Sequence, residues 1–102
     1  MRDLSMERVE SKVGVKFKAV GRITTVNEAY FEKMLTDALE EGFNRIILNM
    51  QEVTIMTSIG IRIILKTYKS CLEAGGRFRI EDPSTVVQNV MGLSALQQMM
   101  VD

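Results

Sequence analysis

Apolar and polar residues alternate near the start of the chain, in two segments that cover residues 8–13 and 14–20. In the second segment, lysines separate the apolar side chains: Val15, Phe17 and Ala19 alternate with Lys16 and Lys18. This alternation is typical of a strand with one buried side and one solvent-facing side. We therefore predict two strands that meet in a turn near residues 11–14, the second of which ends at Gly21.

A helical period replaces the alternation a few residues later. Thr25-Val26-Asn27-Glu28 matches a capping box, in which the threonine hydroxyl accepts a helical N–H and the glutamate bonds back. We predict that Thr24 and Thr25 cap a helix that runs to about Glu41 and stops at Gly42. Its apolar stripe comprises Phe31, Met34, Leu35, Ala38 and Leu39.

The middle of the chain contains a buried strand followed by a second helix. Residues 45–49 include three consecutive apolar positions, which favours a strand buried on both faces between parallel neighbours. A helix is predicted from Ser58 to about Ala74, closed by Gly75 and Gly76. Its predicted core stripe comprises Ile61, Ile64, Leu65, Tyr68 and Leu72.

The last third predicts a strand over residues 77–81 and a helix over residues 83–91 that stops at Gly92. Residues 95–101 fit either a short strand or a turn. The order β-β-α-β-α-β-α predicts an α/β fold: a four- to five-stranded mixed sheet with helices packed on it. We expect a single domain over residues 1–102, with its core at about 8–100.

Composition narrows the classes of function. Thirteen basic and thirteen acidic residues balance, so nothing favours nucleic acid or an anionic membrane as a partner. The absence of histidine removes Ser-His and Cys-His nucleophiles and most zinc sites. The single Cys71 fits a reducing compartment. No run approaches the roughly 20 apolar residues that span a bilayer. We expect a cytoplasmic protein that is not an enzyme and needs no cofactor or metal.

Two hydroxyl residues, Thr57 and Ser58, stand where the central strand gives way to the second helix. Unpaired N–H groups and the helix dipole favour a phosphate at such a position. Serine is also a common N-cap, so Ser58 is either an ordinary cap or a phosphoacceptor, and the two roles are compatible. Thr57 is the second candidate for phosphorylation.

These features together resemble the STAS domain family, over about residues 13–100. The residues that carry the resemblance are Val20-Gly21-Arg22-Ile23, Ile46-Ile47-Leu48-Asn49-Met50, Met56-Thr57-Ser58-Ile59-Gly60-Ile61, Ala74-Gly75-Gly76, Pro83 and Met91-Gly92-Leu93. In the anti-sigma factor antagonists of this family, a partner that is both anti-sigma factor and serine kinase phosphorylates a hydroxyl at the helix start. A phosphatase reverses the modification.

Three positions depart from the family pattern. Ile59 stands at the usual phosphoacceptor, while Thr57 and Thr24 replace aspartates that the family commonly carries. Ser58 does match the first serine of the motif. Ile59 cannot accept phosphate. The resemblance therefore implies either that phosphorylation has moved to Ser58 or Thr57, or that this domain is not switched by phosphorylation.

The resemblance implies docking onto an anti-sigma factor or serine kinase of the histidine-kinase-like ATPase type. The predicted partner surface comprises Thr24, Thr25, Thr57, Ser58, Ile59, Gly60, Arg62, Ile63 and Lys66. For Ile59 and Ile63, a place in the core is the competing interpretation. Two alternative functions stay open: a non-phosphorylated STAS subunit of a larger regulatory or transport assembly, and a small nucleotide-binding domain.

Overall fold

A computed structural model describes residues 3–92 and 98–99. Its elements follow the predicted order: β1 (Leu4–Ser11), β2 (Gly14–Ile23), α1 (Glu28–Glu40), β3 (Arg45–Met56), α2 (Ser58–Glu73), β4 (Arg77–Glu81) and α3 (Thr85–Met91). The four strands form one sheet in the order β1-β2-β3-β4. β1 is antiparallel to β2, whereas β3 runs parallel to both β2 and β4. The mixed four-stranded α/β sheet is confirmed.

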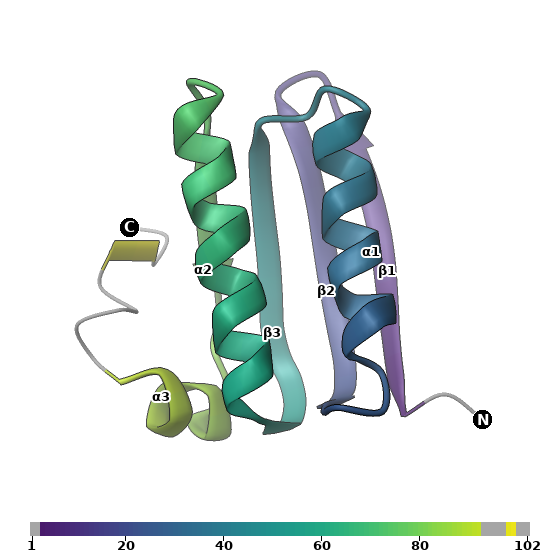
Figure 1. Ribbon diagram of the computed structural model, residues 1–102, viewed down its shortest axis with the longest axis vertical. Helices are drawn as coiled ribbons and strands as arrows, with labels where there is room; N and C mark the ends of the chain where they lie inside the picture. Colours follow the sequence, from purple (N-terminus) through teal and green to yellow (C-terminus); the bar gives the residue numbers. More distant parts are fainter. Residues whose placement is uncertain (1–2, 93–97, 100–102) are drawn as a thin grey trace.

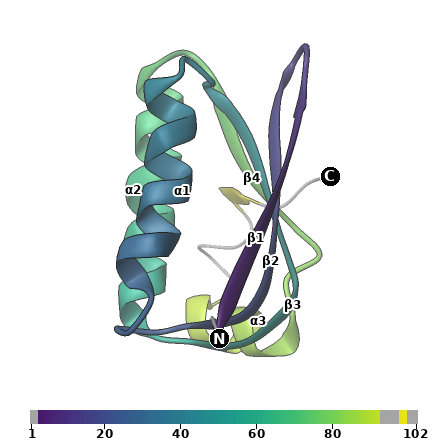
Figure 2. The ribbon, with the colours of Figure 1, turned by 90° about the vertical axis from the view of Figure 1, so that its right-hand side faces the viewer.

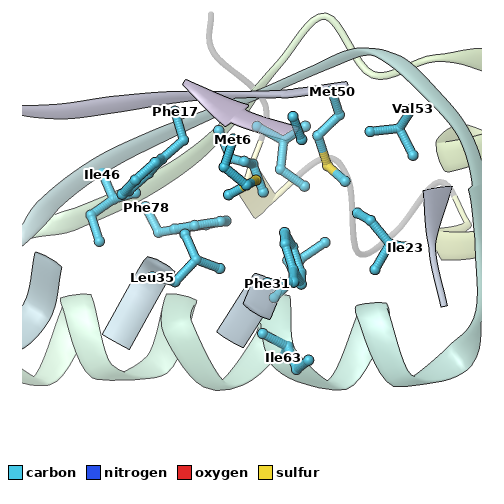
Figure 3. Packing of buried hydrophobic residues seen from close by; sticks show 14 of the residues in the cluster. Met6, Phe17, Ile23, Phe31, Leu35, Ile46, Met50, Val53, Ile63 and Phe78 are labelled. Atoms are coloured by element: carbon cyan, nitrogen blue, oxygen red, sulfur yellow. The ribbon is translucent and has the colours of Figure 1, made fainter. Parts of the chain in front are cut away.

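Two layers make up the molecule. α1 and α2 lie side by side along one face of the sheet, and α3 lies at its foot, as Figures 1 and 2 show. The core fills the space between the sheet and these two helices (Figure 3). Its largest fully buried side chains include Phe17 and Phe78 from the strands and Phe31 and Leu35 from α1. Alternate side chains of the strands point to the other face, which α1 and α2 leave uncovered.

Three of the strands differ in extent from their predicted ranges. β1 begins at Leu4 rather than residue 8, because Leu4 and Met6 are buried against the helices. The core therefore starts before the predicted residue 8. β2 continues past Gly21, whose φ of 117° accommodates an irregularity in the pairing with β3. β3 extends to Met56, because its second half pairs with the end of β2 up to Ile23.

Helix α1 confirms its predicted stripe, since Phe31, Leu35 and Ala38 are buried. The stripe predicted for α2 is partly wrong. Ile64 is fully buried and Ile61 and Tyr68 pack against the core, but Leu65 and Leu72 are 42% and 48% exposed. The buried residues of α2 are Gly60, Ile63, Ile64, Thr67 and Cys71. A polar residue is tolerated on this face because the Thr67 hydroxyl donates to the Ile63 carbonyl, 2.8 Å away.

The end of the chain confirms the predicted strand and corrects the helix that follows it. β4 covers the predicted residues, while α3 begins at Thr85 rather than residue 83. Ser84 is its N-cap and accepts from the Val87 N–H, which fixes this later start. Most of the predicted tail, residues 95–101, lies outside the described residues. Of that tail, Gln98 and Met99 are helical, and Met99 is fully buried.

Candidate functional site

The ends of β2 and β3 meet the start of α2 at one edge of the molecule (Figure 1). The Thr57 N–H donates to the Ile23 carbonyl at 3.1 Å, and the Gly60 N–H donates to the Thr57 carbonyl at 3.0 Å. These two bonds hold the first turn of α2 against the end of β2. The loop after β2 and the start of α2, separate in sequence, therefore lie next to each other.

Thr57, not Ser58, occupies the N-cap position of α2, so the predicted capping role of Ser58 is wrong. The Thr57 side chain makes no capping bond, and its hydroxyl oxygen is buried without a hydrogen-bond partner among the described residues. Ser58 is the first helical residue and is exposed. Its side chain faces solvent at the positive end of the helix dipole. Of the two candidate phosphoacceptors, only Ser58 presents an exposed side chain.

The loop between β2 and α1 does not form the predicted capping box. Asn27 stands at the cap position, yet its amide accepts from the Thr24 N–H at 3.0 Å and donates to the Arg22 carbonyl at 2.7 Å. The Thr24 hydroxyl accepts from the Val26 N–H at 3.2 Å, within the loop. Thr25 is exposed and caps nothing. The asparagine ties the loop back to β2, and this leaves Thr25 facing solvent beside the α2 start.

Gly60 explains how closely α2 approaches the sheet. A Cβ at this position would lie 2.7 Å from the Met56 Cγ and 2.9 Å from the Ile23 Cγ2. No side chain larger than hydrogen fits without movement of these two buried neighbours. Gly60 is itself buried, so it positions the predicted partner surface without forming part of its exterior.

A hollow of about 350 Å³ separates the first turns of α1 and α2. Ile59, Ile63, Arg62 and Lys66 line it from α2, with Glu28, Ala29 and Glu32 from α1. Lys66 forms an ion pair with Glu32 at 3.0 Å across the hollow. Arg62 is exposed and has no carboxylate within 4.0 Å among the described residues. The hollow thus has an apolar floor and a rim on which one cation is not neutralised.

Ile63 is 5% exposed and packs in the core, so its assignment to a partner surface is corrected (Figure 3). Ile59 is partly buried and packs against the core while its remaining surface lines the hollow. Glu28, Ala29 and Glu32 are site residues that the sequence interpretation missed. The sequence did hold a signal for the two glutamates. Glu28 and Glu32 are four residues apart, as are Arg62 and Lys66, and the two pairs carry opposite charges.

The single cysteine of the chain, Cys71, lies in the core and not at this surface. Burial raises the pKa of the Cys71 thiol to about 11, which keeps it protonated and unreactive at neutral pH. Residues 3–92 and 98–99 contain no cluster of three or more metal-binding side chains. Within the same residues, no helix has the length and apolar character needed to cross a bilayer.

Comparisons with known proteins agree with this architecture. A Thermotoga maritima protein classed by prediction as an anti-sigma factor antagonist is 30% identical over 73 residues, which are 71% of this chain. The matched segment spans 65% of that relative's length. A Thermotoga neapolitana homologue of it is 29% identical over the same fractions of both chains.

Solved structures show the same fold at lower identity. The anti-sigma factor antagonist SpoIIAA in its unphosphorylated form superposes with a TM-score of 0.82 at 20% identity, over 96% of this chain and 87% of its own. An anti-sigma factor antagonist from Mycobacterium paratuberculosis gives a TM-score of 0.81 at 14% identity, over 95% and 82% of the two chains. The family model of the STAS domain matches residues 5–101. The chain therefore belongs to the STAS domain family.

Proposed function

We propose that this STAS domain regulates by binding another protein, which it docks through the surface at the start of α2. The proposed partner is an anti-sigma factor or serine kinase of the histidine-kinase-like ATPase type. The α2 docking surface comprises Thr24, Thr25, Ser58, Ile59, Arg62 and Lys66. The observation that carries the proposal is that Ile59, Arg62 and Lys66 line one hollow at the start of α2 and are at least partly exposed. Ser58 is exposed in the first turn of the same helix, and the bond from the Thr57 N–H to the Ile23 carbonyl brings the loop that holds Thr24 and Thr25 next to this turn.

The chemistry of the α2 docking surface suits a protein partner. Ile59 gives it an apolar centre, and Arg62 and Lys66 place cations on the rim. Interfaces commonly combine an apolar centre with a polar rim, and arginine is enriched among the residues that dominate their affinity. Because Arg62 has no carboxylate partner, an acidic group on the partner can pair with it without first breaking an ion pair.

Phosphorylation of Ser58 supplies the proposed switch. The phosphate would bring a charge of about −2 to the first turn of α2, where the helix dipole favours it. Arg62 follows four residues later on the same face, within the spacing at which helical side chains interact. A phosphate at Ser58 would therefore compete for the cation that the partner needs. It would weaken docking and leave the fold intact.

The alternative is a non-phosphorylated STAS subunit of a larger assembly. Ile59 at the family's acceptor position and the buried Thr57 hydroxyl both favour it, because neither can receive a phosphate as placed. This domain would use the same α2 docking surface without a switch. A nucleotide-binding role has less support, since the chain lacks a glycine-rich phosphate loop followed by lysine.

Incubation with the cognate kinase and ATP, followed by mass spectrometry, tests the switch. We expect one phosphate, located on Ser58, and no incorporation into Ser58→Ala. Ser5→Ala, which removes an exposed hydroxyl on β1, is the matched control and should be phosphorylated normally. Binding without incorporation would support the non-phosphorylated subunit. Phosphate on Thr57 would contradict the assignment to Ser58.

Charge reversal at Arg62 tests the docking surface. We expect Arg62→Glu to weaken partner binding at least about tenfold, because truncating or reversing an interfacial arginine commonly costs more than 1.4 kcal/mol. Lys69→Glu is the matched control: an exposed cation farther along α2, outside the hollow, that should leave affinity unchanged. Circular dichroism checks that both variants fold. Equal losses for the two variants would contradict docking at this surface.

A further inference from the structure

The uncovered face of the sheet carries a second feature, at the opposite end from the α2 docking surface. Strand register aligns Val9 with Lys16, Lys16 with Ile47, and Ile47 with Arg79, in a row across all four strands. The next row, at the ends of the strands, aligns Ser11 with Gly14 and Arg45 with Arg77. Residues that are aligned across neighbouring strands point to the same face of the sheet, and so do residues two positions apart in one strand. Both rows therefore lie on the same face.

The start of β2 comes unusually close to the start of β3 at Gly14. A Cβ on Gly14 would clash with the Arg45 carbonyl oxygen, so glycine is the residue that permits this approach. A hollow of about 430 Å³ opens there, lined with apolar surface from Val9, Val13 and Ile47. Val9 and Val13 are 65% and 72% exposed, so the hollow's apolar lip is in contact with water.

Three arginines surround the hollow: Arg45, Arg77 and Arg79. None has a carboxylate within 4.0 Å in the part of the chain that the structure describes. The lysines of this face differ, because Lys16 pairs with Glu81 and Lys18 with Glu52. The hollow thus combines an apolar lining with three arginines that form no ion pair within the described residues.

We propose that this hollow binds a small amphiphilic carboxylate, such as a medium-chain fatty acid. The arginine fork matches a carboxylate in geometry and charge, and an apolar chain would cover Val9, Val13 and Ile47. The volume lies within the range of small-molecule sites, roughly 300–1,000 Å³. The proposal is independent of docking at α2, which lies at the other end of the molecule.

Titration of the full chain with octanoate, followed by two-dimensional amide NMR, tests the proposal. We expect saturable shifts confined to the β1–β2 turn and to the starts of β3 and β4. Hexanoate should bind more weakly, since each methylene removed from water is worth up to about fourfold in affinity. Acetate and octanol should bind far more weakly, because acetate lacks the apolar chain and octanol lacks the carboxylate.

Single substitutions separate the two halves of the site. We expect Arg79→Gln to weaken octanoate binding roughly three- to fivefold, the effect of losing one exposed ion pair. Val13→Ser should also weaken octanoate binding. Because Val13 is a 72% exposed turn residue, we expect this substitution to change the stability of the fold little. Arg22→Gln, at an exposed arginine near the other end of β2 and outside the hollow, is the matched control and should bind octanoate normally.

The titrations distinguish specific carboxylate binding in the hollow from non-specific binding. Shifts at the hollow that saturate with octanoate and weaken in Arg79→Gln support the proposal. Shifts that spread over the molecule, or equal binding of octanol and octanoate, would overturn it. An equal loss of octanoate binding in Arg22→Gln and Arg79→Gln would overturn it too. An acidic peptide that binds the hollow while octanoate does not would assign the site to a protein partner, against the small ligand proposed here.

Discussion

The two faces of the sheet are built from the same strands in opposite ways. On the face under α1 and α2, the strands contribute fully buried apolar side chains such as Phe17, Leu48 and Ile80. On the other face, the neighbouring residues in sequence include Lys18 and Glu81. Lys18 forms an ion pair with Glu52, and Glu81 forms one with Lys16. Apolar residues on this second face include Ile47 and Val9.

This difference indicates that the covered face supplies most of the stability, while the other face is free to carry a binding site. The covered face removes apolar area from water, and that burial dominates folding free energy. Ion pairs between exposed groups contribute little, commonly less than about 1 kcal/mol each. The uncovered face can therefore carry arginines and an open hollow at small cost to the fold. Adjacent residues of one strand allow this division to be measured.

Leu48→Ala should give the largest loss of stability. Leu48 is fully buried beneath the helices, and a leucine truncated in a core costs about 2–5 kcal/mol in free energy of unfolding. Urea denaturation monitored by circular dichroism measures it. A loss below about 1 kcal/mol would mean that the covered face is loosely packed, and the contrast between the faces would fail.

Ile47→Ala, at the preceding residue, should cost about 1 kcal/mol, because this side chain lies on the uncovered face and is only partly buried. The same denaturation experiment gives the comparison directly. A cost equal to that of Leu48→Ala would indicate that something covers this face in solution, for example a second copy of the chain.

Glu81→Gln should have the smallest effect, and one that depends on pH. Hydrogen bonds from Lys16 and Asn49 lower the pKa of the Glu81 carboxyl below its usual value. A lowered folded-state pKa stabilises the protein above the unfolded-state pKa and ceases to do so as pH falls through the folded-state value. We expect Glu81→Gln to cost about 0.5 kcal/mol at pH 7 and less at an acid pH below the folded-state pKa. The same cost at both pH values would rule out this carboxylate as the cause.

Strand and helix positions follow closely from the hydrophobic pattern, but their ends do not. β4 was predictable because apolar and polar residues alternate along its whole length. β3 was predicted to be about half its true length, since Gln51, Glu52 and Thr54 are polar and only pairing with β2 keeps that segment extended. The α2 stripe was displaced because Gly60 and Thr67, which are not strongly apolar, occupy its centre.

The candidate site was partly predictable. The family resemblance placed it at the start of α2, and Ile59, Arg62 and Lys66 do line one hollow there. The contribution of α1 was missed, because Glu28 and Glu32 join the site only through the packing of one helix on another. The choice between core and surface for Ile63 also required that packing, which buries all but 5% of it.

The local pattern of residues was enough to establish the order of elements, the family and the face of the sheet that the helices cover, because hydrophobic periodicity and short motifs are local properties of the chain. Tertiary structure alone decided which hydroxyl at the α2 start is exposed, which isoleucine is buried, and where three arginines gather around one hollow. Each of these depends on how segments distant in sequence approach one another. How deeply a side chain is buried, and how much charge gathers around a hollow, depend on all the segments that pack together at that place.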